Sequence, residues 1–104
     1  VGLSRMARLV MRDEDYEKLN AAAEGTNDAL LEVAGELAPR TGEIRILGPL
    51  VPPIARIGGY HRMQFEIIAA NAPSLQTFIM TARDRGILRS DAHMAVDVDP
   101  ISLL

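Results

Sequence analysis

Apolar and polar residues alternate in four short segments of the chain, a pattern typical of strands with one buried face. In the longest segment, His61, Met63 and Phe65 occupy one set of alternate positions, while Tyr60 and Arg62 occupy the other. Each segment therefore predicts a strand. The segments are residues 5–12 (apolar Ala7, Leu9, Met11), 43–46 (Ile44, Ile46), 60–69 (Met63, Phe65, Ile67, Ala69) and 94–99 (Met94, Val96, Val98).

Two longer segments place apolar residues three or four positions apart, which is the spacing of one helix face. The first helix is predicted to begin at Tyr16, to be irregular near Gly25 and to be stopped by Pro39 and Gly42. The second opens at Asn71 and ends at Gly86, a natural helix terminator. The apolar positions are Leu19, Ala23, Leu30, Ala34 and Leu37 in the first helix, and Leu75, Phe78, Ile79 and Ala82 in the second.

The segment Gly48–Gly59 holds three prolines and three glycines in twelve residues, which predicts a stiff loop without regular structure. The order strand, helix, strand, strand, helix, strand predicts an α+β fold of the ferredoxin-like split β-α-β-β-α-β class. Right-handed crossovers would place both helices on one face of a four-stranded antiparallel sheet, with the strands in spatial order 4-1-3-2. Residues 1–104 then form a single domain.

The composition is that of a soluble domain. The chain has no cysteine, which removes disulfides and thiolate metal sites and is typical of a reducing compartment, so we expect a cytoplasmic protein. Apolar runs are too short to cross a bilayer, which argues against a membrane partner. The net charge of −3, with acids in steps of four on the first helix, gives no general affinity for nucleic acids. Those acids are Glu24, Asp28, Glu32 and Glu36.

DNA binding would therefore need a local patch, and the helix-free face of the predicted sheet offers one. Tyr60 shares this face with Arg8, Arg12, Arg45 and Arg62, a set suited to binding single strands through stacking and phosphate contacts. Acidic neighbours dilute the patch, and packing against a neighbouring domain is the commoner use of such a face. The other residues expected there are Gln64, Glu66, Asp97 and Asp99.

The chain shows no catalytic or metal-binding motif. Gly58 and Gly59 lack the spacing and the following helix of a phosphate-binding loop, and no serine has a histidine at a suggestive offset. His61 is expected to be a hydrogen-bonded core histidine. His93 and Asp91 could hold a metal only with ligands from another element, so we expect a solvated strand edge instead.

Two acids on the last predicted strand, Asp97 and Asp99, lie on one face and could be read as paired catalytic acids. Their residue types and positions fit better with pairing across the sheet to Arg8 and Arg12 on the neighbouring strand. We therefore expect no catalytic residue in this chain.

The loop and the third predicted strand, GPLVPPIARIGGYHRMQ at residues 48–64, resemble a run in the family of primosomal protein N′ (PriA), the replication-restart DNA helicases. The ending VDVDP at residues 96–100 resembles the same family's C-terminal signature, in the right order and at the right separation. The resemblance is strong over residues 43–104 and rests on pattern alone over residues 1–42. It implies that the chain is the C-terminal domain of a larger ATP-dependent 3′-5′ helicase, whose ATP- and Mg-binding lobes and zinc-binding cysteines lie upstream.

The resemblance also implies a non-catalytic domain that packs against the helicase core of the same chain. Such a domain binds single-stranded or branched DNA and holds the tail of single-stranded-DNA-binding protein. By position, Arg56 and Arg62 match basic residues of the family, and Gln76 matches a glutamine of the tail-binding site. Four departures weaken these sites: Tyr60 replaces an arginine, His61 and Met63 replace aromatics, and Ala72 stands where a partner-binding arginine can occur.

Two other interpretations remain open at this point. The first is a stand-alone ferredoxin-like regulatory module that binds a small ligand or self-associates through its open sheet. The second is an acylphosphatase-like enzyme, which would need an arginine anion cradle in the first loop. The chain has Asp13, Glu14 and Asp15 there, which makes this the weakest of the three.

Overall fold

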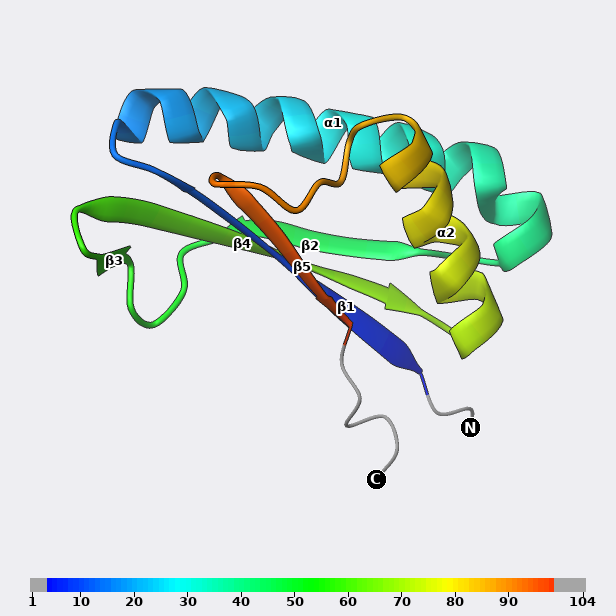
Figure 1. Ribbon diagram of the computed structural model, residues 1–104. Coiled ribbons are helices and arrows are strands. Elements are labelled where there is room, and N and C mark those ends of the chain that lie inside the picture. Colours follow the sequence, from blue (N-terminus) through cyan, green and yellow to red (C-terminus); the bar gives the residue numbers. More distant parts are fainter. Residues whose placement is uncertain (1–3, 99–104) are drawn as a thin grey trace.

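The computed structural model describes residues 4–98, and its elements follow the predicted order with one added short strand (Figure 1). The strands form an antiparallel sheet in the order β2-β4-β1-β5, with β3 paired to β4. Both helices cover the same face of this sheet (Figure 1). The fold is therefore the predicted ferredoxin-like split arrangement. The elements are β1 (Arg5–Asp13), α1 (Tyr16–Thr41), β2 (Arg45–Leu50), β3 (Arg56–Ile57), β4 (Tyr60–Ala69), α2 (Ala72–Asp84) and β5 (Met94–Val98).

The core lies between the sheet and the two helices. Every apolar position predicted for the first and third strands and for the two helices is buried. On β4, for example, Phe65 and Ile67 are fully buried, because the alternation turns them toward α1 and α2. On β5 only Met94 is buried: Val96 is partly buried, and Val98 lies opposite Ala7 but stays 50% exposed.

The prediction of an irregular loop over residues 48–59 was wrong at both ends. Strand β2 continues to Leu50, and β3 pairs with β4 across a two-residue turn at Gly58 and Gly59. The pairing of β2 with β4 shifts register between Leu47 and Leu50, which marks an irregularity in this edge strand. Edge strands tolerate proline and glycine, so these residues interrupt the ladder here without ending the strand.

Gly48 is required by its surroundings in β2. Its φ of +139° lies in a region that residues with a side chain rarely adopt. A Cβ atom at this position would also lie 2.9 Å from the Gln64 carbonyl oxygen and 2.9 Å from Cδ2 of buried Phe65. The backbone of β2 can therefore approach β4 this closely only with glycine.

Helix α1 is continuous, so the predicted irregularity near Gly25 was wrong. Glycine in a helix interior costs only about 0.5–1 kcal/mol relative to alanine, and the buried residues on either side of it outweigh that cost. The Asp15 side chain caps the helix by accepting hydrogen bonds from the backbone N–H groups of Glu17 and Lys18. The helix continues through Pro39 to Thr41, and Gly42, whose φ is +74°, forms its C-cap.

Candidate functional site

In the middle of the open sheet face, the face that the helices leave uncovered, acids outnumber arginine. Arg8 on β1 lies opposite Glu66 on β4 and opposite Asp97 on β5, so the register places an acid on each side of it. The predicted placement of Asp97 opposite Arg8 is confirmed. The predicted acidic partner of Arg12 was wrong, because the register places Arg12 next to His93, before β5 begins, and Asp99 lies outside the described residues. Arg45 is separate, opposite Ile68 toward the end of the sheet. These two arginines therefore do not form one patch with the others.

Positive charge gathers at the other end of the open face, next to β3. Arg12 and Arg62 are cross-strand partners there. The Arg12 guanidinium carbon lies 4.4 Å from the centre of the Tyr60 ring, a cation–π contact, and its Nε donates to the Ala92 carbonyl oxygen at 2.7 Å. Nη1 of Arg62 donates to the Ile54 carbonyl oxygen at 2.8 Å. A guanidinium has five N–H donors, and each of these hydrogen bonds uses one. We call Arg12, Tyr60 and Arg62 the basic end.

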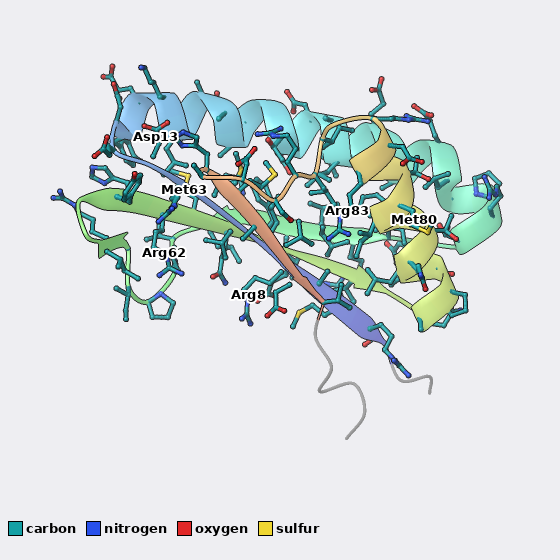
Figure 2. All side chains as sticks on the ribbon, viewed as in Figure 1. Arg8, Asp13, Arg62, Met63, Met80 and Arg83 are labelled. Atoms are coloured by element: carbon teal, nitrogen blue, oxygen red, sulfur yellow. The ribbon has the colours of Figure 1, made fainter. Side chains whose placement is uncertain are left out.

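Arg56 lies apart from the basic end although it is close in the sequence. Its ladder partner is His61, which alternates to the helix side, whereas Ile57 pairs with Tyr60 on the open side. Figure 2 shows Arg8 and Arg62 projecting away from the helices, and Met63 projecting toward them. Arg56 is exposed and lies at the edge of the same hairpin.

His61 is not the core histidine that its place in the alternation predicted. It is half-buried, and its ring lies edge-on to Tyr16, with the ring centres 5.5 Å apart. The reason is that α1 begins at Tyr16, so the helix covers this end of β4 only with its first turn.

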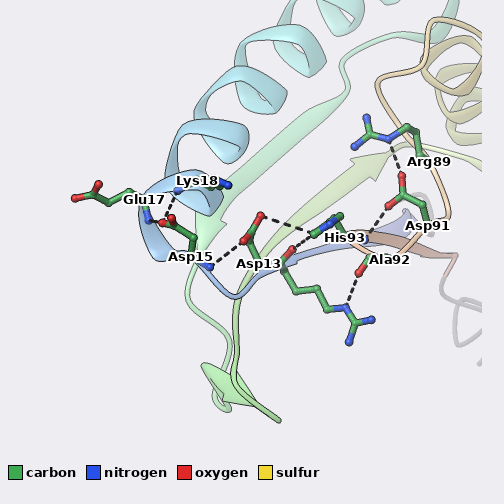
Figure 3. Close-up of polar contacts among 9 residues, drawn as sticks. Asp13, Asp15, Glu17, Lys18, Arg89, Asp91, Ala92 and His93 are labelled. Atoms are coloured by element: carbon green, nitrogen blue, oxygen red, sulfur yellow. Dashed lines mark hydrogen bonds and ion pairs between the residues drawn. The ribbon is translucent and has the colours of Figure 1, made fainter.

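The loop that leads into β5 carries a polar cluster, drawn in Figure 3. Nδ1 of His93 lies 3.0 Å from the Arg12 carbonyl oxygen and 3.7 Å from Oδ2 of Asp13. Asp91 accepts hydrogen bonds from the His93 backbone N–H and from Nε of Arg89, each at 2.9 Å. These two bonds lower the pKa of Asp91, the backbone bond most strongly.

This cluster positions the loop that leads into β5, and His93 is exposed at the strand edge, as expected. The second metal ligand considered with it, Asp91, has both carboxylate oxygens in hydrogen bonds to the loop itself. Within residues 4–98, no three metal-ligating side chains gather closely enough to hold an ion.

The acidic row on α1 is exposed, as its spacing predicts. Its last member, Glu36, accepts a hydrogen bond from Nη2 of Arg85 at 2.9 Å, which joins α1 to the residue after α2. This bond and the charge of Arg85 lower the pKa of Glu36. The row still presents a negative surface on the side of the molecule opposite to the basic end.

A groove of about 330 Å³ opens between α2 and the neighbouring ends of β1 and β5. Gln76, predicted to bind a partner, lines this groove, and so does Ala72, where the expected arginine is missing. Two arginines outside the predicted site, Arg5 and Arg83, line it as well. Figure 2 shows Met80 and Arg83 side by side on α2. The apolar lining is formed by Leu75, Ile79, Met80 and Val98.

One of these arginines could have been found from the sequence. Arg5 continues the alternate set of Ala7, Leu9 and Met11, so its parity places it on the helix side of β1. Arg83 carries no such signal, because a basic residue in the last turn of a helix is favourable whichever way its side chain points. The groove needs both elements and can be recognised only once α2 is packed on the sheet.

Comparison with known families identifies the domain. Residues 3–101 match the family model of the primosomal protein N C-terminal domain. The chain belongs to this family. The match includes residues 3–42, for which the sequence resemblance rested on pattern alone. Membership connects the domain with the primosome and with replication restart.

Two further findings accompany this assignment to the primosomal protein N C-terminal family. A search of curated proteins found no match to the chain. Over the described part of the chain, no helix combines the length and apolar character needed to cross a membrane.

Proposed function

We propose that this chain is a non-catalytic DNA- and protein-interaction domain of an ATP-dependent replication-restart helicase of the cytoplasm. In this proposal it binds single-stranded or branched DNA and packs against the helicase core of the same chain. ATP, Mg²⁺ and zinc are handled by upstream parts of that chain. The family match supports the replication-restart context, and the basic end supports DNA binding.

The proposal of DNA binding rests on the basic end, because groups that can bind phosphate and a ring that can stack on a base lie there in one small area. Arg12 and Arg62 place two positive charges in register on adjacent strands, within reach of successive phosphates. Tyr60 supplies an aromatic face beside them, already in contact with the Arg12 guanidinium. Arginines with an aromatic ring form the usual platform for a single strand, since any base can stack on it.

The charge distribution also sets the direction of approach and the strength of binding. DNA would meet the open face near β3, because the acidic row of α1 lies on the other side of the sheet and repels phosphate. The positive charge of Arg8 is outweighed by Glu66 and Asp97 opposite it. The net charge of −3 further predicts weak binding that falls steeply with added salt.

The test is a titration of a single-stranded oligonucleotide into the isotope-labelled 104-residue chain at low salt. We expect chemical-shift changes at residues 56–64 and at the Arg12 end of β1. Arg12→Gln should lower the slope of log affinity against log salt by about one, since it removes one phosphate contact. The matched control is Arg83→Gln, an exposed arginine in the groove at the other end of the sheet. Shift changes centred on residues 24–36 would refute the proposal.

The groove favours a second, compatible function, the binding of an acidic tail such as that of single-stranded-DNA-binding protein. Its apolar side chains suit an apolar chain end, and Arg5 and Arg83 suit carboxylates beside it. Gln76 lies in the same groove and can both donate and accept hydrogen bonds. Ala72 lacks a charge that would strengthen the site, so we expect weak binding by this domain alone.

A peptide with an acidic stretch and an apolar carboxyl-terminal end tests this second function. Gln76→Ala and Arg83→Gln should each weaken binding, and Ala72→Arg should strengthen it, because it adds a cation beside Gln76. Arg12→Gln serves as the control and should leave the affinity unchanged. If all three groove variants bind the peptide with the affinity of the natural chain, the groove is excluded as the tail site.

A further inference from the structure

The segment from β2 to β3 carries a concentration of exposed apolar side chains. Eight large apolar or aromatic residues are exposed within residues 4–98, and four of them fall between positions 50 and 57. Single exposed apolar residues are common and need no explanation, whereas a cluster marks an interaction surface. The four residues, here called the apolar loop, are Leu50 (41% exposed), Val51 (68%), Ile54 (60%) and Ile57 (52%).

The apolar loop is held in place by β4. Nη1 of Arg62 donates to the Ile54 carbonyl oxygen, and the Arg62 backbone N–H donates to the Ala55 carbonyl oxygen, both at 2.8 Å. Pro52 is buried, and it also restricts the backbone of the loop. The side chain of Ile54 is therefore presented outward by a fixed backbone, and its exposure does not come from fraying.

The loop lies on the same side of the sheet as the basic end. Leu50 pairs with Gln64, and Ile57 pairs with Tyr60, so both belong to the open face. Figure 1 shows the segment between β2 and β3 at the end of the sheet away from α2, on the side that the helices leave uncovered. Arg62 touches both features, since it pairs with Arg12 and also bonds to the loop.

The charge around the apolar loop favours a polyanion as its partner. Arg56 and Arg62 lie within or beside the loop, and Arg12 is the cross-strand partner of Arg62, so three arginines border it. An apolar surface bordered by arginines and a tyrosine complements a nucleobase between its phosphates. A protein partner would need an apolar patch with acidic side chains placed to face the arginines. In DNA, every nucleotide combines an apolar base face with a negatively charged phosphate.

We propose that the apolar loop contacts unstacked nucleobases at a DNA branch or end, with Ile54 and Ile57 against the base faces and the basic end on the neighbouring phosphates. Branched apolar side chains are known to wedge against base steps in this way. The interior of a continuous duplex hides its base faces by stacking, so the loop gives a preference for forked DNA. This inference rests on the proposed DNA-binding function and adds the side chains that contact the bases.

The experiment compares two DNA probes and three forms of the 104-residue chain. The probes are a fork with 2-aminopurine at the unpaired position next to the junction, and a closed dumbbell duplex of the same length. The proteins are the natural chain, the double variant Ile54→Ser/Ile57→Ser, and the control Leu31→Ser. Leu31 is 51% exposed, which matches Ile57, and lies on the acidic helix α1.

We expect the natural chain to prefer the fork and to change the 2-aminopurine fluorescence. The double variant should bind the fork about tenfold more weakly, the size expected for losing one to two base contacts. It should keep the natural salt slope and the natural affinity for the dumbbell, because no phosphate contact is removed. Ile54→Ser alone should lose about threefold on the fork, and Leu31→Ser should match the natural chain.

Three outcomes would overturn the inference. If the natural chain binds DNA but the double variant binds the fork equally well, the loop faces another partner and the DNA-binding function stands. If the natural chain binds neither probe, both proposals fail. If sedimentation shows that the natural chain self-associates and the double variant does not, a second copy of the chain occupies the loop.

Discussion

The same substitution, glycine to alanine, should change the stability of this domain by different amounts at three positions, and with the opposite sign at one of them. Gly48 has a φ of +139° and lies against β4, Gly58 has a φ of +57° with open space around it, and Gly25 lies in α1 with open space around it. The added methyl group is identical in each case. Differences in stability therefore report the backbone conformation and the local contacts alone.

At Gly48 two costs add. A side chain in an unfavourable backbone region costs on the order of 1–3 kcal/mol. The new methyl group would also lie 2.9 Å from Cδ2 of Phe65, which is fully buried and cannot move away, and overpacking of this kind costs about 1–3 kcal/mol. We expect Gly48→Ala to lower the free energy of unfolding by about 3 kcal/mol and the melting temperature by on the order of 15 °C.

At the other two positions no atom lies within 4 Å of the added methyl group. Gly58→Ala should cost about 1 kcal/mol, the backbone penalty alone. Gly25→Ala should stabilise the domain by about 0.5–1 kcal/mol, because alanine loses less backbone entropy than glycine when the helix forms.

Urea and thermal unfolding of the three variants measure these effects. A domain of this size has a stability of about 5–15 kcal/mol, so each variant should remain folded at 25 °C. The reasoning fails if Gly48→Ala unfolds at the same urea concentration as the natural chain. It fails equally if Gly25→Ala is the most destabilised of the three.

Three further predictions test individual contacts. Arg62→Met should lower the heteronuclear NOE of residues 51–57 while the centre of the sheet stays rigid. If the NOE of these residues does not change, the Arg62 side chain does not hold the loop in place. Arg85 lowers the pKa of Glu36, so this pair stabilises the fold above the ordinary carboxyl value of 4.5, and the stabilisation is lost as the pH falls through the lower folded-state pKa. Urea unfolding of Glu36→Gln at several pH values should show less loss of stability over that range, and an unaltered pH profile would contradict the assignment. Asn71→Ala should cost about 1 kcal/mol in thermal unfolding, because its side chain caps α2, and the capping assignment is wrong if the melting temperature is unchanged.

The fold could be predicted because the buried residues follow regular periods. Alternation on β1 and β4 and the helical spacing on α1 and α2 each report which side of the element faces the core, and all of those positions are buried. The errors lie where glycine or proline was interpreted locally. Gly25 did not disturb α1, and Gly48 and Pro49 did not end β2, because tertiary packing outweighs local propensity.

The candidate site was harder to predict because it depends on cross-strand neighbours. The sequence placed five arginines or aromatics on one face, but register decides which charges are balanced. The register places acids beside Arg8 and a second arginine beside Arg12. The contact of Arg62 with the loop likewise depends on how residues 50–57 fold back on β4, which no periodicity reports.

Strand β1 connects the two proposed binding surfaces and also keeps them apart. Arg5 lines the groove and Arg12 belongs to the basic end, and seven residues of extended strand separate them by about 23 Å. At physiological ionic strength the Debye length is about 8 Å, so the charge of a bound phosphate is largely screened at that distance. DNA on the basic end should therefore leave the affinity of the groove for an acidic peptide unchanged within about twofold. A peptide titration with and without saturating oligonucleotide measures this directly, and strong competition would mean that both ligands share one surface.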